Sequence, residues 1–189
     1  MTAVRRLGVL LVAGLAFGVA VAAVKGQDVG VRDALGNTSA PWVLVPFVAG
    51  TRYRRPWHGA LAGLAATMAA FLGFYAAEAA ILDLGPHPWY EDLRLTLGTF
   101  NVYEQWGLVS GPAYGALGAL WAQRRIIAAP IAVGLAFVAE PLIVWLLWHA
   151  GIWGGGGLLL AHAWMWIGEV LLGVACIAFV LARRQPRIS

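Results

Sequence analysis

Three carboxylic acids lie inside long apolar stretches of the sequence. Glu140 follows "GLAFVA" and precedes Pro141, Glu169 lies in "WIGEVLLG", and Glu78 follows "GFYAA". An acidic side chain at the centre of a membrane-spanning helix costs about 2.5 to 3.5 kcal/mol on insertion scales, so such groups usually face other helices or a water-filled cavity. Each acid must then be protonated, hydrogen-bonded to neutral partners or matched by a bound cation.

Other polar and aromatic residues share helix faces with these acids or lie in the outer half of neighbouring spans. Residues spaced three, four or seven apart lie on one face of a helix. This spacing predicts one stripe of His162, Trp166 and Glu169 and a second of Tyr75 and Glu78. Acids mixed with aromatic rings favour a cationic or amine-bearing ligand through charge and cation-π contacts. The sequence therefore predicts an outward-facing ligand pocket made of Glu140, Glu169, Glu78, Tyr75, His162, Trp166, Tyr114, Ser110, Asn37 and Trp42.

Two other functions fit the same residues. In the first, the protein is a structural or accessory subunit whose acids only hydrogen-bond neighbouring helices, at about 0.6 kcal/mol per bond. Replacing Glu140 with glutamine is then expected to be mild, because an amide can replace a neutral acid. In the second, an intramembrane enzyme uses His162 with Glu140 or Glu169. The sequence contains no HExxH motif and no nucleophile elbow, so it predicts no catalytic residue, no metal site and no cofactor.

The composition places these residues in a membrane. Hydrophobic residues make up 61% of the chain, charged residues only 12%, and the mean hydropathy is +0.75, whereas soluble domains are about 25% charged. About 20 apolar residues cross a bilayer, so the 189 residues accommodate one transmembrane domain and no separate soluble domain. We predict an all-α polytopic protein with six membrane-spanning helices, at 7–24, 33–50, 57–82, 106–122, 126–150 and 158–181.

Three segments of this arrangement admit alternatives. The second span contains Pro41 and Pro46, which predict a shorter, kinked or partly re-entrant helix. The first span also has the features of a cleaved secretory signal, although its apolar run exceeds the usual 7 to 15 residues. The outer loop 83–105 is long and carries aromatic residues and carboxylates, which predicts an interfacial helix or a lid.

The basic residues predict the orientation. Ten of the thirteen lysines and arginines fall on one side of the six-span arrangement, and basic residues accumulate on the cytoplasmic side. Both termini are therefore predicted to be cytoplasmic, with the arginines against anionic lipid headgroups. This asymmetry accounts for the net charge of +4, so no nucleic acid partner is predicted. The ten residues are Arg5, Arg6, Arg52, Arg54, Arg55, Arg124, Arg125, Arg183, Arg184 and Arg187.

Glycines recur at intervals of four residues on three of the predicted spans. Small residues at this interval let membrane helices approach closely, so the fourth span is predicted to be central. The same faces are candidates for contact with a membrane protein partner or a second copy of the chain. The glycines are Gly14 and Gly18, Gly59 and Gly63, and the series Gly107, Gly111 and Gly115.

Three stretches carry a resemblance to a known group of proteins. They are "NTSAPWVLVPFVAGTRYRRPWHGALAG" (37–63), "GFYAAE" (73–78) and "WGLVSGPAYGALGALW" (106–121). Together they resemble a family of small uncharacterised bacterial integral membrane proteins, which implies six helices, a multi-pass location in the bacterial cytoplasmic membrane and no established activity. In architecture alone, the chain also resembles the substrate-binding subunits of energy-coupling-factor vitamin transporters. Ala16 and Ala20 match the spacing with which such subunits dock their partner.

Overall fold

Helices form the secondary structure of the residues that the computed structural model describes, which are 3–26, 30–81, 88–98, 102–152 and 161–183. Within these ranges there is no β-strand. The long helices are α1 (Ala3–Lys25), α4 (Pro56–Ile81), α6 (Val102–Arg124), α7 (Ala128–His149) and α9 (Ala163–Ala182). The short helices are α2 (Val31–Gly36), the 3₁₀ helix η1 (Ala40–Val43), α3 (Leu44–Gly50) and α5 (Trp89–Gly98).

Four of the described helices are long and apolar enough to cross a membrane. They are α1, α4, α7 and α9, with apolar segments Val4–Lys25, Pro56–Ala80, Ala128–His149 and Ala163–Ala182. Helix α6 has 23 residues, about 35 Å at 1.5 Å per residue, but it is more polar. Residues 82 and 158–160 of the predicted spans lie outside the described ranges. The described residues thus form an all-α structure with four helices long and apolar enough to cross a membrane, and the count of six spans stays a prediction.

The second predicted span is not one continuous helix. It consists of α2, η1 and α3, with a break at residues 37–39 rather than at a proline. Side chains close the end of α2: the Asn37 amide donates to the backbone oxygen of Asp33 at 2.8 Å, and the Thr38 hydroxyl donates to the backbone oxygen of Leu35 at 2.8 Å. Pro41 suits the first turn of the next helix, where its missing N–H has no helical partner to lose.

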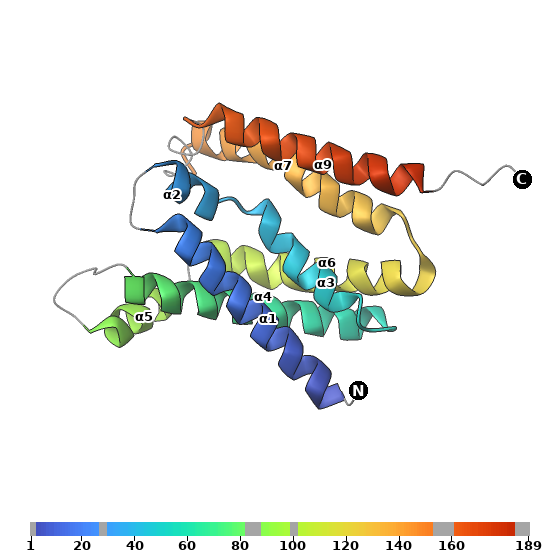
Figure 1. The fold of residues 1–189 in the computed structure, drawn as a ribbon, viewed down its shortest axis with the longest axis horizontal. Helices are drawn as coiled ribbons and strands as arrows, with labels where there is room; N and C mark the ends of the chain where they lie inside the picture. The colour runs from blue at the N-terminus through green and yellow to red at the C-terminus, as the bar shows by residue number, and fades with distance from the viewer. Residues whose placement is uncertain (1–2, 27–29, 82–87, 99–101, 153–160, 184–189) are drawn as a thin grey trace, which may run out of the picture.

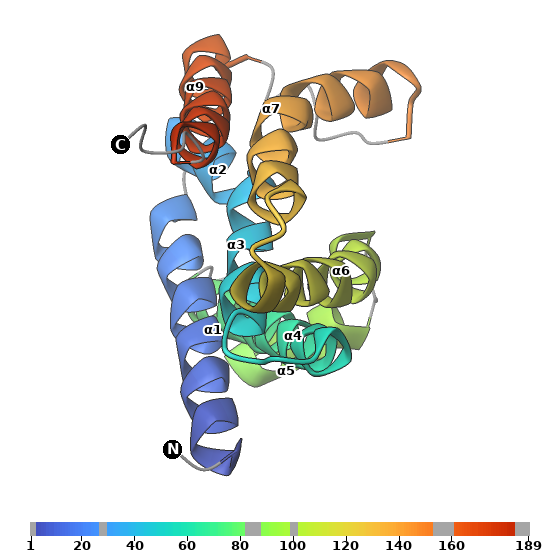
Figure 2. The same ribbon diagram turned by 90° about the vertical axis from the view of Figure 1, so that its right-hand side faces the viewer.

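The helices form two layers with the broken segment between them (Figure 1). In one layer α4 packs against α1 and α6, and α3 of the broken segment lies against α4 and α6 of this layer. The other layer is the pair α7 and α9, which meets the first layer through η1 and α6 (Figure 2). Glycines mark the contact between α7 and α9, because a Cβ atom on Gly173 would lie 2.6 Å from the backbone oxygen of Gly134.

Close helix contacts confirm the prediction from the glycine spacing. A Cβ atom on Gly18 would lie 1.9 Å from the backbone oxygen of Ala70, across the contact between α1 and α4. A Cβ atom on Gly115 would lie 2.3 Å from the backbone oxygen of Gly59, across the contact between α6 and α4. Helix α6 thus lies against α3, α4 and α7, as predicted for a central helix. Association with a partner protein through such faces stays a prediction.

The predicted outer loop contains helix α5, and residues 82–87 and 99–101 of this region lie outside the described ranges. Trp89 and Tyr90 at the start of α5 are exposed, and their interfacial position stays a prediction. Helix α6 begins at Val102, before the predicted start of the fourth span. As a result Glu104 lies buried in the first turn of α6 rather than in a loop.

A buried carboxyl pair at a broken helix

Glu140 binds the backbone of the broken segment. Its side chain is on α7 and only 6% exposed. One carboxylate oxygen, Oε1, accepts a hydrogen bond from the backbone N–H of Ser39, and Oε2 accepts one from the N–H of Ala40 at 2.5 Å. Glu140 lies about 100 residues away from these donors in the sequence, so this contact joins the two layers of the fold.

The break in the second span explains why a carboxylate is needed here. The first N–H groups of any helix have no partner within that helix. Ser39 is the N-cap of η1 and its own side chain makes no capping hydrogen bond. Glu140 supplies the missing acceptors from another helix, and its negative charge suits the partial positive charge of a helix N-terminus. A deprotonated carboxylate, which only accepts, matches two N–H donors.

Glu169 lies beside Glu140 but lacks such donors. It lies on α9 and is 9% exposed. Its carboxyl group is close enough to the Glu140 carboxyl group for the two to interact electrostatically. Among the described residues, neither Glu169 oxygen has a hydrogen-bond donor in good geometry. Two adjacent carboxyl groups in a low-dielectric site do not both ionise readily. The pair therefore combines one capped carboxylate with one carboxyl group whose oxygens accept no hydrogen bond from a described residue.

The surroundings of Glu169 on α9 are apolar. Trp166, one turn before Glu169, is 6% exposed and packs in a core cluster with Ala34, Val144 and Met165. The predicted stripe on this helix thus holds for Trp166 and Glu169. His162, the third predicted member, is half-buried and precedes the first residue of α9.

The third predicted acid, Glu78, has a cationic partner. The Lys25 ammonium at the end of α1 contacts Glu78 Oε1, and both side chains are largely buried. The same ammonium lies 5.5 Å from the centre of the Phe74 ring. The sequence predicts that each acid is protonated, hydrogen-bonded to neutral partners or matched by a bound cation. For Glu78 this is wrong, because Lys25, one residue beyond the predicted span 7–24, supplies the cation. The reason is that α1 packs along α4 and brings its last residue to the face that carries Glu78.

This ion pair yields a stability prediction. Lys25→Met should lower the free energy of unfolding by about 1.5 to 3 kcal/mol, because it leaves Glu78 largely buried without its cation. The double variant Lys25→Met/Glu78→Met should recover part of this loss. Melting temperatures of the four proteins in one detergent form a double-mutant cycle. Strictly additive losses would mean that the two side chains do not interact.

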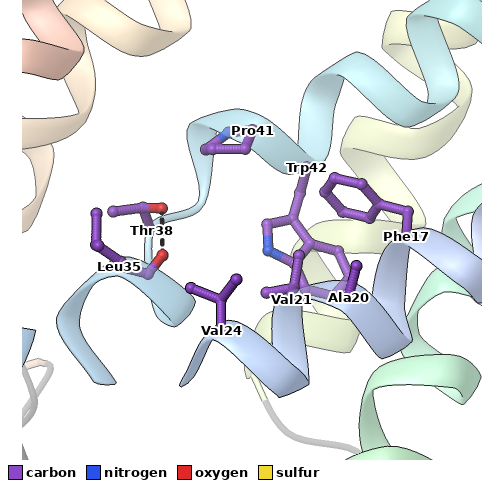
Figure 3. Close-up of a pocket in the computed structure, with 8 residues that line it drawn as sticks. All are labelled: Phe17, Ala20, Val21, Val24, Leu35, Thr38, Pro41 and Trp42. Atoms are coloured by element: carbon purple, nitrogen blue, oxygen red, sulfur yellow. Dashed lines mark hydrogen bonds between the residues drawn. The ribbon is translucent and has the colours of Figure 1, made fainter. Parts of the chain in front are cut away.

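Two predicted aromatic residues lie in a separate cluster near α1. The Trp42 ring stacks on Phe71 at 4.9 Å between centroids, and Tyr75 is buried beside Phe74. A small cavity of about 180 Å³ opens between α1 and the broken segment, next to Trp42 (Figure 3). Its lining is almost entirely apolar and includes neither Glu140 nor Glu169: Phe17, Ala20, Val21, Val24, Leu35, Thr38, Pro41 and Trp42.

The remaining predicted site residues serve their own local structures. The Tyr114 hydroxyl on α6 donates to the backbone oxygen of Ala132 on α7 at 3.4 Å. The Asn37 amide also donates to the Asp33 carboxylate at 3.0 Å. Ser110 is half-buried on α6. The described structure thus brings Glu140, Glu169 and Trp166 close together, and places Trp42, Tyr75 and Glu78 in another part of the fold.

Sequence reasoning missed the backbone N–H groups that Glu140 binds. A local signal was present in "SAPW", because a serine two residues before a proline is typical of a helix start. A helix start at Ser39 predicts backbone N–H groups without a helical partner in the second span. The distance in sequence between Ser39 and Glu140 gave no indication that these two would meet.

These features define the class of the protein. Helices able to cross a membrane, and acids buried between them, characterise a helical membrane protein. Among the described residues no group of three or more His, Cys, Asp or Glu could hold a metal ion. The chain belongs to a family of unknown function, DUF6518, which matches residues 1–189. This confirms the predicted membership of an uncharacterised family. Searches among curated proteins and among solved structures found no match.

Proposed function

We propose that this protein binds a proton or a small cation at the pair Glu140 and Glu169, as part of binding or transporting a small molecule across a bacterial cytoplasmic membrane. The supporting observation is the Glu169 carboxyl group, whose oxygens are buried without a donor beside a second carboxyl group. A buried polar group without a partner costs about 1 to 3 kcal/mol. A bound proton or cation removes much of that cost, because it reduces the repulsion between the two acids.

The position of the pair favours a role in transport. In membrane transporters, helices broken near the middle of the bilayer present free backbone groups to ions and charged substrates. Here the break at residues 37–39 lies against Glu140, where α7 meets the other layer. A cation that binds between Glu140 and Glu169 therefore changes the charge at this junction. The six-span topology and cytoplasmic termini belong to the same proposal.

A structural or accessory role is the second candidate. The observation in its favour is that both Glu140 oxygens already accept backbone N–H groups. In that case Glu140 only closes the broken helix, and Glu169 stays permanently protonated. The two candidates differ in one measurable property, which is whether Glu169 exchanges its proton or binds cations while the protein stays folded.

The test compares the wild type with Glu169→Gln in lipid nanodiscs. Infrared spectra detect the C=O stretch of a protonated carboxyl group, and melting temperatures are measured with sodium, potassium or an alkylammonium salt at constant ionic strength. We expect either a carboxyl band that responds to buffer pH or a cation-dependent rise in melting temperature. At 100 times its dissociation constant a ligand stabilises by about 2.7 kcal/mol. Glu169→Gln should abolish the response.

Glu104→Gln is the matched control, because Glu104 is also buried but lies on α6. It should leave both signals unchanged. If the wild type shows neither response, or if Glu169→Gln retains whichever response the wild type shows, the pair is not an ion-binding site. The structural role of Glu140 would then be the better explanation for both acids.

A further inference from the structure

A second cavity, of about 530 Å³, opens at the end of the molecule that carries the link between α3 and α4. This link and the last turn of α6 lie at the same end of the fold (Figure 1). The cavity is lined by polar and charged side chains for the most part, and does not involve the carboxyl pair. Its lining residues are Thr51, Arg52, Tyr53, Arg54, Ala122 and Gln123.

The two arginines of this cavity carry uncompensated charge. Both guanidinium groups are exposed, and neither forms an ion pair or hydrogen bond with another described residue. Three further arginines adjoin them, with Arg55 on the same link and Arg124 and Arg125 at the end of α6. No acidic residue occurs in the segments 50–60 or 118–130 that form this end. Five positive charges thus gather here without a local carboxylate.

The helix ends at this site do not cancel that charge. Helices α3 and α6 end here, whereas α4 and α7 begin here. A helix C-terminus carries about half a negative charge and an N-terminus about half a positive charge. The two negative and two positive helix ends offset each other, so they leave the five positive charges in place. The helix dipoles therefore do not supply the counter-charge, and the exposed guanidinium groups are available to an anion from outside the chain.

We infer that this cavity binds a phosphate group at the membrane surface. Guanidinium groups hold phosphate oxygens through paired N–H donors, and Arg52 and Arg54 both face the cavity. The Tyr53 hydroxyl and the Gln123 amide add neutral donors. The volume falls in the range of small-molecule sites, about 300 to 1,000 Å³. Basic pockets between membrane helices are typical binding sites for anionic lipid headgroups, and a soluble phosphate ester has the same chemistry.

The test is native mass spectrometry of the full-length protein released from nanodiscs of phosphatidylcholine with or without phosphatidylglycerol. The wild type should retain phosphatidylglycerol in preference to phosphatidylcholine. Arg52→Gln/Arg54→Gln should lower that retention at least tenfold, because it removes two paired-donor contacts. The variant should melt like the wild type, since both side chains are exposed.

Arg5→Gln/Arg6→Gln is the matched control, because it removes the same charge from exposed residues at the start of α1. It should retain the lipid. Equal losses in both variants would overturn the site and leave only general attraction between basic residues and anionic lipid.

Displacement of the lipid by inorganic phosphate would support a site that also accepts soluble phosphate esters. Retention of the lipid in excess phosphate, together with loss in Arg52→Gln/Arg54→Gln, would support a lipid site. If the wild type shows no preference for phosphatidylglycerol, and inorganic phosphate displaces no bound lipid, the proposal is overturned.

Discussion

Gly115→Leu is expected to lower the melting temperature of the detergent-solubilised protein by roughly 10 °C, or to prevent folding. A Cβ atom on this residue would lie 2.3 Å from the backbone oxygen of Gly59 and 2.9 Å from Cα of Gly63. Both obstacles are backbone atoms, so a change of side-chain rotamer cannot relieve the clash. Overpacking a tight contact costs about 1 to 3 kcal/mol and occasionally more, and 1 kcal/mol corresponds to about 2 to 4 °C in a chain of this length.

The same residue also restricts α3. A Cβ atom on Gly50 would lie 1.9 Å from the backbone oxygen of Gly115, so three helices approach one another closely at this point. Moving α6 away from α4 therefore disturbs its contact with α3 as well, which is why the effect should exceed that of an ordinary core substitution.

Gly8→Leu is the matched control for this prediction. Gly8 is exposed on α1, and a Cβ atom there would meet nothing within 4 Å. This variant should melt within a few degrees of the wild type, with a small gain from helix propensity. If Gly115→Leu melts like Gly8→Leu in the same detergent, the close contact between α4 and α6 is absent in solution.

The glycine contacts illustrate which features of the fold can be predicted from the sequence. The spacing of Gly107, Gly111 and Gly115 predicts a helix that packs closely, because small residues on one face permit it whatever the partner. The spacing does not identify the partner, since any helix with a small-residue face would satisfy it. Helix existence and apolar length follow from local composition in the same way, and four of the predicted spans appear as long apolar helices.

The candidate site was less predictable because it depends on pairs that are far apart in the chain. Helical spacing correctly places Trp166 and Glu169 on one buried face, as a local property should. The contact of Lys25 with Glu78 spans 53 residues, and it depends on how far α1 extends along α4. The sequence of the second span shows two prolines, but it does not show where the helix breaks. The break lies at residues 37–39, where the side chains of Asn37 and Thr38 bind the last carbonyl groups of α2.

Glu140 provides the other large expected effect. Glu140→Gln should lower the free energy of unfolding by about 2 kcal/mol or more, even though the side chains have the same shape. Both carboxylate oxygens accept backbone N–H groups, from Ser39 and Ala40. A glutamine side chain offers one acceptor and places an NH₂ donor against the other N–H. One buried bond is lost and its donor is left without a partner, which costs about 1 to 3 kcal/mol.

This expectation reverses the one drawn from the sequence, where an amide was predicted to replace a neutral acid with little loss. Glu169→Gln is the matched comparison, because Glu169 is equally buried but accepts no hydrogen bond from a described residue. Melting temperatures of both variants in one detergent should show a large loss for Glu140→Gln and a small change or a gain for Glu169→Gln. Equal effects would contradict the capping role of Glu140. A large loss confined to Glu140→Gln would mean that the broken second span depends on both acceptor oxygens that α7 supplies, so that Glu140 stabilises the contact between the two layers whatever the state of Glu169.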